Sequence, residues 1–494
     1  MSEIDEKQQR IELYPLPDGW IWETVNSVGG GKKNAIVDGP FGSNLKVSDY
    51  VESGPVPVLT TKNLEGDYSK VRYITADKFE ELKRSAVNPN DILMAKIGSC
   101  GKLGIYPTNA TQAMIPANLL KVTVADGYDL KYVYYFFSSP FFKRSLNTII
   151  KSTAQPAFGV TDFKRLPFPR APLSVQKSIV AEIEKQFSRL DEAVASLKRI
   201  QANLKRYKAA VLKAAVEGKL TEQWRKEHPA AEPADQLLKR ILAERRAKWE
   251  AEELAKMKVK GSVGAKHASP DSWEKKYKEP AGPDKANLPE LPEGWVWTIL
   301  ENVAEVVDPH PSHRTPVSVI NGVSYIGMGD ITSEGKINFQ KARKIAHEVL
   351  IEHKERYSLK PGDFIFGKIG TIGKPVRLCG PYEYALSANV ILMQPNPNST
   401  DPDYCFTFMA SPLMETVIKK ESKATTQAAF GIQKVRLIAY PLPPLREQEE
   451  IRNEVGRRLS VTEELETSIE TNLKRAERLR QTILMSAFSG NLPT

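Results

Sequence analysis

Residues 173–217 read LSVQKSIVAEIEKQFSRLDEAVASLKRIQANLKRYKAAVLKAAVE, and this stretch decides how the chain is organised. Proline is absent from it, and Ala, Leu, Glu, Lys, Arg and Gln dominate, which are strong helix formers. Apolar residues recur at steps of three and four or multiples of them, at Ile183, Phe187, Leu190, Val194, Leu197, Leu204, Val211 and Ala215. The pattern predicts one amphipathic helix of roughly 65 Å.

A second stretch of the same kind occupies residues 445–489, 272 positions later. Each copy follows a proline-rich entry, LPFPRAP or YPLPP, and each ends at a glycine, Gly218 or Gly490. A helix of this length cannot bury its apolar stripe against itself. We therefore expect the two long helices to pack on each other.

The repeat extends beyond the two helices. LPDGWIW at residues 16–22 returns as LPEGWVW at residues 291–297. Three short sequences return at an offset of 272: Lys96-Ile97-Gly98 as Lys368-Ile369-Gly370, Ser139-Pro140 as Ser411-Pro412, and Phe158-Gly159 as Phe430-Gly431. The chain is thus predicted to contain two copies of one unit, a globular piece followed by a long helix.

The composition excludes several classes of protein. The 494 residues allow three or four domains, and 41% hydrophobic with 26% charged residues is ordinary for a soluble protein. No apolar run reaches the ~20 residues of a membrane span. The charged start MSEIDEKQQR has no apolar signal core, so a cytoplasmic location is expected.

Cysteine usage and charge give weaker indications. Cys100, Cys379 and Cys405 are widely spaced, which favours a reducing compartment and neither a disulfide framework nor a zinc site. The net charge of +10 fits a polyanionic partner, although many basic proteins have none.

The loop DGPFGSNLK at residues 38–46 carries polar Ser43, Asn44 and Lys46. It is either a plain surface turn or a loop that faces nucleic acid, since Asn, Ser and Lys donate to bases and phosphates. A short strand VLTT then ends in Lys62-Asn63, whereas the matching place of the second unit has Gly329-Asp330. Two sites that read different sequences would show this difference, and so would drift in a duplicated surface.

NPNDILMAKIGSCGK at residues 88–102 and KPGDFIFGKIGTIGK at 360–374 each predict a turn, an apolar strand and a glycine-rich loop. A phosphate-binding P-loop is excluded, because only two residues separate Gly98 from Gly101 and Leu103 follows Lys102. A nuclease-like pair of Asp91 and Lys96 lacks the second carboxylate of a metal site. These aspartates are expected to cap the turns.

The lysines of these loops, with Ser99 or Thr371 beside them, are expected to contact DNA. The loop KSTAQPAFGV, repeated as SKATTQAAFGI, adds a glutamine in each copy, and glutamine can read base edges. The candidate DNA-binding residues are Ser43, Asn44, Lys46, Lys62, Asn63, Lys96, Ser99, Lys102, Gln155, Lys368, Thr371, Lys374 and Gln427. No catalytic residue and no metal ligand is predicted.

The aromatic residues are expected mainly in the core rather than stacked on bases. This applies to Trp20 and Trp22, to Phe158 and Phe430, and to the aromatic residues of two short helices that meet at Ser139-Pro140. Residues 235–258 form a charged helical stretch in which Glu and Lys or Arg recur at i,i+4, which predicts a solvated or partner-facing helix.

Motifs of catalysis are missing from the sequence. An adenine N6-methyltransferase needs Asp or Asn before Pro-Pro-Tyr/Phe, and the Pro-Pro pair here is Pro443-Pro444 followed by Leu445. There is no helicase motif and no HExxH, and the six histidines are not clustered.

Taken together, these features resemble the specificity subunit, HsdS type, of type I DNA restriction–modification enzymes. The matching stretches are LPxGWxW, PGDFIFGKIG, AFGI, PLPPLREQEEI, ILMSAFSGNL and VLKAAVEGKLTEQWR. The resemblance runs from about residue 13 to the end of the sequence, and the duplicated order of globule, proline-rich entry and helix is its strongest part.

The resemblance implies an α+β fold in which two α/β target-recognition domains are separated by two long helices that form an antiparallel coiled coil. Each domain would read one half of a bipartite, asymmetric site in double-stranded DNA. The chain would be non-catalytic and bind no cofactor. Its partners would be two modification subunits, which use S-adenosylmethionine, and restriction subunits, which use ATP and Mg²⁺.

The expected domains divide the whole chain. A lead-in (1–14) precedes target-recognition domain 1 (15–170), the first long helix (171–220), the charged helical extension (221–258), a linker (259–287), target-recognition domain 2 (288–442) and the second long helix (443–490). Two alternatives stay open, a stand-alone DNA-modifying enzyme and a coiled-coil scaffold without a role at DNA.

Overall fold

The computed structural model divides the chain into two compact units. Unit 1 comprises Met1–Arg199 and Ser468–Thr494, and unit 2 comprises Ile200–Thr467. The structure describes residues 11–68, 71–151, 154–229, 232–261, 276–284, 288–310, 314–332, 334–422 and 430–492. Most of the expected lead-in and much of the expected linker lie outside these residues.

Unit 1 contains short strands and helices that end in a long helix. In chain order they are β1 (Ile21–Thr24), α1 (Val25–Val28), β2 (Ile36–Asp38), β3 (Val56–Val58), β4 (Arg72–Ile74), α2 (Ala76–Glu81), β5 (Ala86–Val87), β6 (Ile92–Ala95), β7 (Leu103–Ile105), β8 (Ala113–Met114), β9 (Leu119–Val122), α3 (Leu130–Ser138), α4 (Pro140–Asn147), α5 (Val160–Lys164), β10 (Pro167–Arg170) and α6 (Leu173–Val216), which continues into unit 2. The predicted strand VLTT lies slightly earlier than expected, because the chain turns after Val58.

Two four-stranded sheets form the globular part of unit 1, with strand orders β2-β9-β6-β7 and β4-β3-β8-β5. β1 pairs with β10, which brings the two ends of the globule together immediately before α6. β6 and β9 consist of fully buried residues, as interior strands require, whereas β2 is an edge strand of its sheet.

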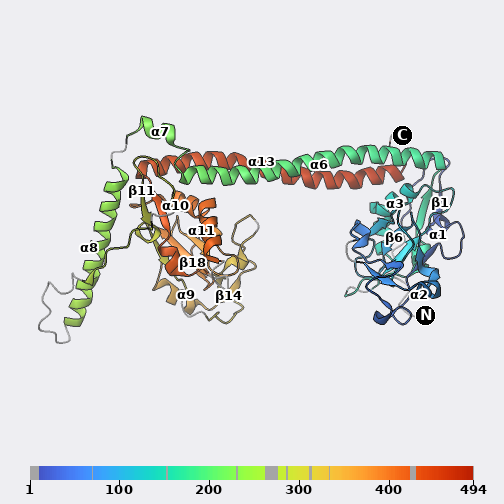
Figure 1. The fold of residues 1–494 in the computed structure, drawn as a ribbon, viewed down its shortest axis with the longest axis horizontal. Coiled ribbons are helices and arrows are strands. Elements are labelled where there is room, and N and C mark those ends of the chain that lie inside the picture. The colour runs from blue at the N-terminus through green and yellow to red at the C-terminus, as the bar shows by residue number, and fades with distance from the viewer. Residues whose placement is uncertain are drawn as a thin grey trace. The chain divides into compact units, whose positions relative to one another are not determined.

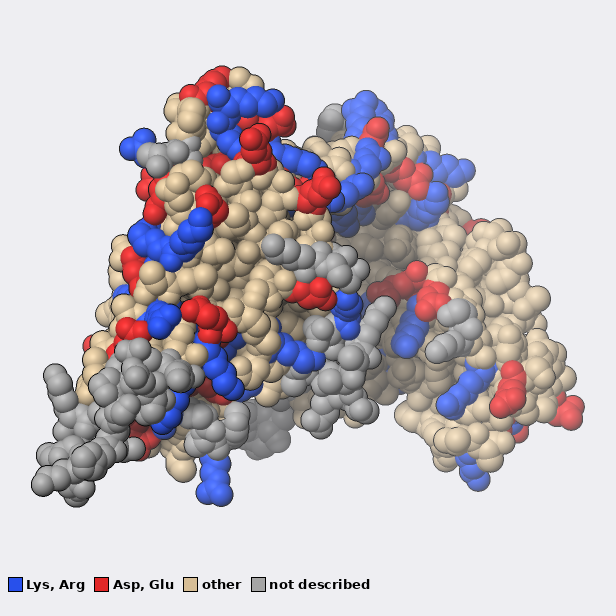
Figure 2. Space-filling model, turned by 60° about the vertical axis from the view of Figure 1, so that its left-hand side comes forward, with Lys and Arg blue, Asp and Glu red and all other residues tan. Residues whose placement is uncertain are grey.

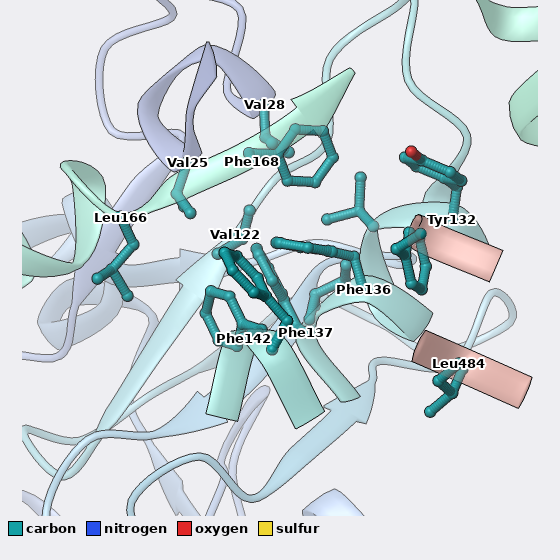
Figure 3. Packing of buried hydrophobic residues seen from close by; sticks show 14 of the residues in the cluster. Val25, Val28, Val122, Tyr132, Phe136, Phe137, Phe142, Leu166, Phe168 and Leu484 are labelled. Atoms are coloured by element: carbon teal, nitrogen blue, oxygen red, sulfur yellow. The ribbon is translucent and has the colours of Figure 1, made fainter. Parts of the chain in front are cut away.

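The core of unit 1 is aromatic, as the sequence predicts. Phe136 and Phe142 of α3 and α4 pack with Phe168 of β10 and Val122 of β9 (Figure 3). Ser139 caps α4 by accepting a hydrogen bond from Phe142 N, and Pro140 follows at the first helical position. The expected break between the two helices is therefore confirmed.

Unit 2 repeats this plan. Its elements are α7 (Glu222–Glu227), α8 (Ala234–Gly261), β11 (Val296–Ile299), β12 (Ala304–Val307), β13 (Val323–Ile326), β14 (Arg343–Ile345), α9 (His347–Lys354), β15 (Phe364–Gly367), β16 (Pro375–Arg377), β17 (Tyr384–Leu386), β18 (Val390–Pro395), α10 (Pro402–Met409), α11 (Pro412–Ser422), α12 (Ile432–Arg436), β19 (Ala439–Leu442) and α13 (Leu445–Phe488), which ends in unit 1. The sheet order β12-β18-β15-β16 and the pair β11-β19 match those of unit 1, whereas the second sheet has three strands, β14-β13-β17, in place of four.

The charged extension is helical, as predicted. α8 buries Leu237 and Ile241 in the core of unit 2. Farther along the helix, Arg246 forms an i,i+4 ion pair with Glu250 at 2.9 Å. Such pairs stabilise an exposed helix by a few tenths of a kcal/mol each.

The two long helices lie side by side and antiparallel (Figure 1). In unit 1, Ile183 and Phe187 near the start of α6 share a core with Leu484 and Phe488 near the end of α13. In unit 2, Val211 near the end of α6 shares a core with Ile451 near the start of α13. Both predicted helices are correct to within one residue at each end.

A buried glutamine attaches the start of each long helix to its globule. In unit 1, Gln176 Oε1 accepts a hydrogen bond from Asp129 N, and its Nε2 donates to Ala171 O, both at 2.8 Å. In unit 2, Gln448 Oε1 accepts from Asp401 N, and its Nε2 donates to Pro443 O, again at 2.8 Å.

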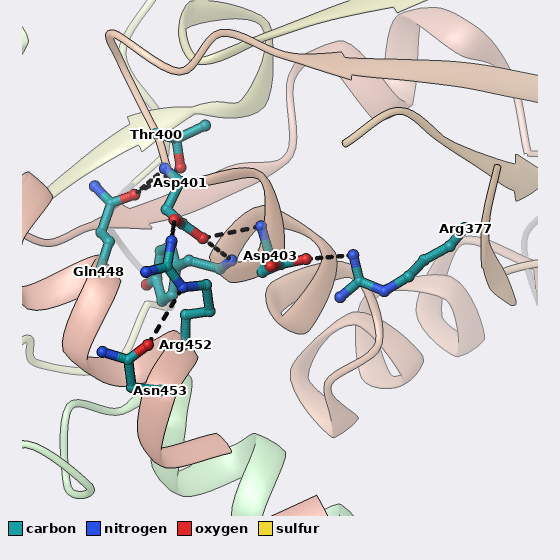
Figure 4. Close-up of polar contacts among 8 residues, drawn as sticks. Arg377, Thr400, Asp401, Asp403, Gln448, Arg452 and Asn453 are labelled. Atoms are coloured by element: carbon teal, nitrogen blue, oxygen red, sulfur yellow. Dashed lines mark hydrogen bonds and ion pairs between the residues drawn. The ribbon is translucent and has the colours of Figure 1, made fainter. Parts of the chain in front are cut away.

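The unit 2 attachment has additional bonds, which Figure 4 shows. Thr400 Oγ1 also donates to Gln448 Oε1 at 2.8 Å, and Arg452 of α13 pairs with the Asp401 carboxylate at 2.6 Å. Asp401 in turn caps α10 by accepting from Asp403 N. These contacts fix the direction in which α13 leaves the globule of unit 2.

Each unit is closed by the end of the long helix that belongs to the other repeat. In unit 1, Tyr14 Oη donates to Phe488 O at 2.8 Å, and Gly490 lies against Pro17. In unit 2, Gly218 at the end of α6 lies against Pro292 in the equivalent way. Both glycines have positive φ, so each ends its helix in a left-handed turn.

Candidate nucleic-acid interface

An interior strand of each unit, β6 or β15, ends in the same Lys-Ile-Gly sequence and the same backbone frame. Lys96 N donates to Asn118 O at 2.8 Å, and Lys368 N donates to Asn389 O at 2.9 Å. The glutamine-containing loops attach to this frame, because Phe158 N donates to Lys96 O and Phe430 N to Lys368 O. Both phenylalanines are buried, as expected.

The lysine of each frame forms an ion pair with an aspartate at or directly after the end of an edge strand, β2 or β12, which lies two strands away in the same sheet. Lys96 Nζ lies 2.6 Å from Asp38 Oδ2, and Lys368 Nζ lies 3.0 Å from Asp308 Oδ2. Lys96 is only 6% exposed. The geometry therefore gives both lysines a role inside the protein, whereas the sequence pointed to DNA contacts for them. The repeated Val-Asp of VDGP and VDPH was the missed signal for the aspartates.

Asn63 also has an internal role. It is 2% exposed, its Oδ1 accepts from Thr60 N at 2.5 Å, and its Nδ2 donates to Asp67 O at 2.6 Å. These bonds stabilise the turn that follows β3. The turn brings the neighbouring Lys62 to the surface.

The remaining candidates of unit 1 lie at segments that converge on the loop between Lys96 and Lys102. Lys102 pairs with Glu65 at 2.8 Å, which joins this loop to the turn at Lys62. Gly98 N donates to Pro156 O at 2.8 Å, which joins it to the loop of Gln155. The exposed candidates of the two units are Ser43, Asn44, Lys46, Lys62, Ser99, Gln155, Thr371 and Lys374. Gln427 lies outside the described residues.

The expected turn-capping role of Asp91 and Asp363 is confirmed. Asp91 Oδ2 accepts from Asn88 N at 2.8 Å, and Asp363 Oδ2 accepts from Lys360 N at 3.0 Å. Both carboxylates are buried beneath the sheet ends, so they hold the strands that carry the Lys-Ile-Gly frames.

Unit 2 has an open cleft of about 550 Å³ beside its Lys-Ile-Gly frame. Its lining includes Gly329, Asp330 and Ile369, which were singled out from the sequence. Lys341 and Arg343 also line it, and they were not identified from the sequence. The basic run KARK at residues 341–344 was the available signal. The cleft thus offers a hydrogen-bond acceptor, the carboxylate of Asp330, and the donors of Lys341 and Arg343. Such a combination suits recognition of base edges.

Charges of both signs are interspersed over the face shown in Figure 2. The positive surplus of the sequence is therefore not gathered into one large area on that face. Within the part of the chain that the structure describes, no three or more His, Cys, Asp or Glu side chains are grouped to hold a metal ion. None of the described helices is long and apolar enough to cross a membrane.

Unit 2 also contains a buried chain of hydrogen bonds through two histidines. His310 Nε2 lies 2.9 Å from Arg314 O, so this nitrogen carries a proton and donates. His310 Nδ1 lies 2.8 Å from His353 Nε2, and His353 Nδ1 lies 2.8 Å from Tyr357 Oη. Burial, with His310 and Arg356 nearby, lowers the pKa of His353 to about 4.

Unit 2 should lose stability as the pH falls from about 6.5 to 4. In this window the unfolded chain binds a proton at His353 that the folded chain does not bind, because the folded pKa is the lower one. The full contribution, about 3 kcal/mol, is present above pH 6.5. Urea unfolding at pH values from 7 to 4.5 measures it. The variant His353→Gln should show a shallower pH dependence, and identical slopes would contradict this assignment.

Comparison with protein families gives one match that occurs in both repeats. The type I restriction modification DNA specificity domain matches residues 42–206 and 292–475. The EcoBI specificity subunit of Escherichia coli is 23% identical over 409 residues, which cover 82% of this chain and 74% of that protein. The EcoKI specificity subunit of Escherichia coli strain K12 is 21% identical over 489 residues, which cover 97% and 90%.

Solved structures show the same fold. A chain from a structure of the type I R-M system, studied for complex assembly and conformational transition, superposes with a TM-score of 0.58. The match has 16% sequence identity and covers 97% of this chain and 100% of the other. The paired globules and antiparallel long helices are thus shared with that chain.

Proposed function

Because this chain belongs to the type I restriction modification DNA specificity family, we propose that it reads a bipartite, asymmetric DNA site, one half with each unit. The observation that carries the proposal is that the Lys-Ile-Gly segment has the same backbone hydrogen bonds in both units, while the residues around it differ. Both units fix a Lys-Ile-Gly strand end with the same backbone bonds and the same Lys–Asp pair. Around this frame, unit 1 has the turn at Lys62, and unit 2 has the cleft at Asp330.

The exposed polar residues around each frame contact the DNA in this proposal. They are Ser43, Asn44, Lys46, Lys62, Ser99 and Gln155 in unit 1, and Thr371 and Lys374 in unit 2, joined there by Lys341 and Arg343 of the cleft. Half-buried Lys102, which pairs with Glu65, is proposed as a further contact of unit 1. Lys96, Lys368 and Asn63 hold these groups in place. The ammonium groups of Lys96 and Lys368 are both held in ion pairs, and Lys96 is also buried.

The two long helices set the spacing and provide the scaffold. We propose residues 15–170 and 288–442 as the target-recognition domains and residues 171–220 and 443–490 as the spacer helices. Two modification subunits, which use S-adenosylmethionine, dock on the chain, and restriction subunits, which use ATP and Mg²⁺, join through them. The chain itself is non-catalytic and works in the cytoplasm.

Two other functions make different predictions. A stand-alone DNA-modifying enzyme would transfer methyl groups or cut DNA as the purified chain, without partners. A coiled-coil scaffold without a role at DNA would show no salt-dependent binding to duplex DNA. The differences between the repeated loops favour sequence reading, because a scaffold has no use for two distinct polar surfaces.

Exchanging residues 294–439 for the equivalent segment of a relative should change one half of the modified site and leave the other unchanged. The junctions suit an exchange, because β11 and β19 pair at the two ends of this segment. The readout is the map of methylated adenines in host DNA, obtained by single-molecule sequencing.

The matched control exchanges residues 19–167, where β1 and β10 pair in the same way. It should change the opposite half of the site. If either exchange altered both halves together, independent reading by the two units would be wrong.

A further inference from the structure

Unit 1 contains a second basic site, which lies beside the edge strand β2 and is lined by none of the predicted contact residues. An open cleft of about 510 Å³ lies between the loop of residues 29–35, the strand β2 and the helix α5. Its charged lining residues are Lys32, Lys33, Arg84 and Lys164. No aspartate or glutamate lines this cleft among the described residues.

Little nearby acidic charge balances these four cations. Arg84 donates to Asp38 Oδ1 at 3.0 Å, but the same carboxylate already pairs with Lys96. One negative charge is therefore shared by two cations. Within the described part of the chain, no carboxylate lies within ion-pair distance of Lys32, Lys33 or Lys164. Cations gathered in one cleft repel each other, and an anion in the cleft would relieve this repulsion.

The loop that carries Lys32 and Lys33 requires glycine for its path. Gly30 and Gly31 have φ values of +60° and +68°, which ordinary residues rarely adopt. A Cβ atom at Gly30 would lie 2.6 Å from the Ala125 side chain, whereas Gly31 faces open space. The backbone is thus anchored at Gly30 and leaves the cleft open beside Gly31.

The loop is an insertion that unit 2 lacks. The pairing of β2 with β9, and of β12 with β18, makes Ile36 equivalent to Val306. Val28 is equivalent to Val303, since each accepts a hydrogen bond at its carbonyl oxygen from an equivalent residue, Ala125 or Asn396, three positions beyond the paired residues Val122 and Met393. Seven residues separate Val28 from Ile36, and two separate Val303 from Val306. The extra five residues give unit 1 its two added lysines.

Asp38 joins this cleft to the proposed reading surface of unit 1. On one side it holds Arg84, which lines the cleft, and on the other it holds Lys96, whose ammonium lies 5.5 Å from the ring of Phe41. Phe41 belongs to the loop of residues 38–46 and is 65% exposed. The Asp38 carboxylate therefore links the basic cleft to that loop.

We propose that the cleft formed by Lys32, Lys33, Arg84 and Lys164 binds a backbone phosphate of the DNA, next to the half-site that unit 1 reads. The proposal rests on the proposed function and adds an asymmetry to it. In unit 1, the four cations of this cleft, which we call the clamp, bind the DNA backbone without distinguishing one base from another. Unit 2 lacks the inserted loop that carries Lys32 and Lys33. Phosphate contacts of this kind position a protein on the duplex and make its binding sensitive to salt.

The test compares the double variant K32A/K33A with the wild-type full chain. The probe is a duplex that carries the site mapped in host DNA, and the measurement is the affinity at several salt concentrations. If both lysines neutralise the phosphate in this cleft, the slope of log K against log salt becomes shallower by about one unit. The control K177A/K198A removes two exposed lysines of α6 in the same unit and should keep the wild-type slope.

A second measurement locates the contact on the DNA. Uncharged methylphosphonate linkages placed next to the half-site of unit 1 should weaken wild-type binding more than K32A/K33A binding, because the variant keeps only Arg84 and Lys164 in the cleft. The same linkages next to the other half-site should weaken both proteins equally.

An unchanged slope and affinity for K32A/K33A, while the wild-type chain still recognises its bipartite site, would overturn the clamp and leave the proposed function intact. Equal losses for K32A/K33A and K177A/K198A would also overturn it, because general charge would then explain the effect. A wild-type chain that does not bind the duplex at all would overturn both proposals.

Discussion

A chain whose two long helices are each lengthened by seven residues should modify the same two half-sites with a longer unread gap between them. The insertions belong after Arg199 in α6 and after Thr467 in α13, where the chain divides into its two units. Seven residues keep the apolar stripe in register and lengthen a helix by about 10 Å. At about 3.4 Å per base pair, the gap should grow by about three base pairs.

The sites of insertion follow from the attachment of each helix to its globule. An insertion directly after Pro444 would separate Gln448 from Pro443 and Asp401, and would break the attachment itself. Insertions between the units leave both sets of bonds intact. Mapping of methylated adenines gives the gap length. Efficient modification with the original gap would show that the long helices do not set the spacing.

Replacing Glu447 with alanine should destabilise unit 2 by about 3–5 kcal/mol, since it removes one partner of a buried charge pair. Glu447 is 1% exposed and lies in the first turn of α13. Its Oε1 accepts from Thr221 and from Arg225, and its Oε2 accepts from Trp295 Nε1 at 2.8 Å. One carboxylate thereby joins the segment after α6, the start of the globule and the start of α13.

Glu449→Ala is the matched control, because Glu449 is exposed on the same helix. It should change the free energy of unfolding by no more than about 0.5 kcal/mol. Thermal unfolding followed by tryptophan fluorescence distinguishes the two variants, since Trp295 is a direct partner of Glu447. Equal midpoints for both variants would mean that Glu447 contributes little to the closure of unit 2.

The long helices could be predicted from sequence, and their attachment to the globules could not. The period of Ile183, Phe187 and Leu190 is a local signal that one helix carries by itself. Gln176, in contrast, bonds to the backbone of Asp129, 47 residues earlier, and nothing in the neighbouring residues indicates that partner. The repeat at an offset of 272 indicated the duplication, but it did not indicate the hydrogen bonds that attach each long helix to its globule.

The candidate site was likewise predictable only in part from the sequence. A lysine beside a glycine-rich loop is typical of phosphate contacts, and this led to Lys96 as a DNA ligand. Its partner Asp38 lies 58 residues earlier, on a different strand, and burial of both groups follows from the sheet order β2-β9-β6. The DNA contacts of exposed loop residues such as Ser43 and Asn44 remain predictions. Their place on an exposed loop could be read from the sequence, because the residues that surround them are neighbours in the chain.

Each unit is completed by a segment of the other repeat: Ser468–Thr494 closes unit 1, and the end of α6 at Gly218 closes unit 2. In this respect the chain resembles a domain-swapped dimer contained in one polypeptide. A single repeat of this design would lack its last turns unless a second copy supplied them. Within one chain the exchange is intramolecular, so it does not depend on protein concentration. The two halves can also differ in sequence, which two copies of one chain cannot.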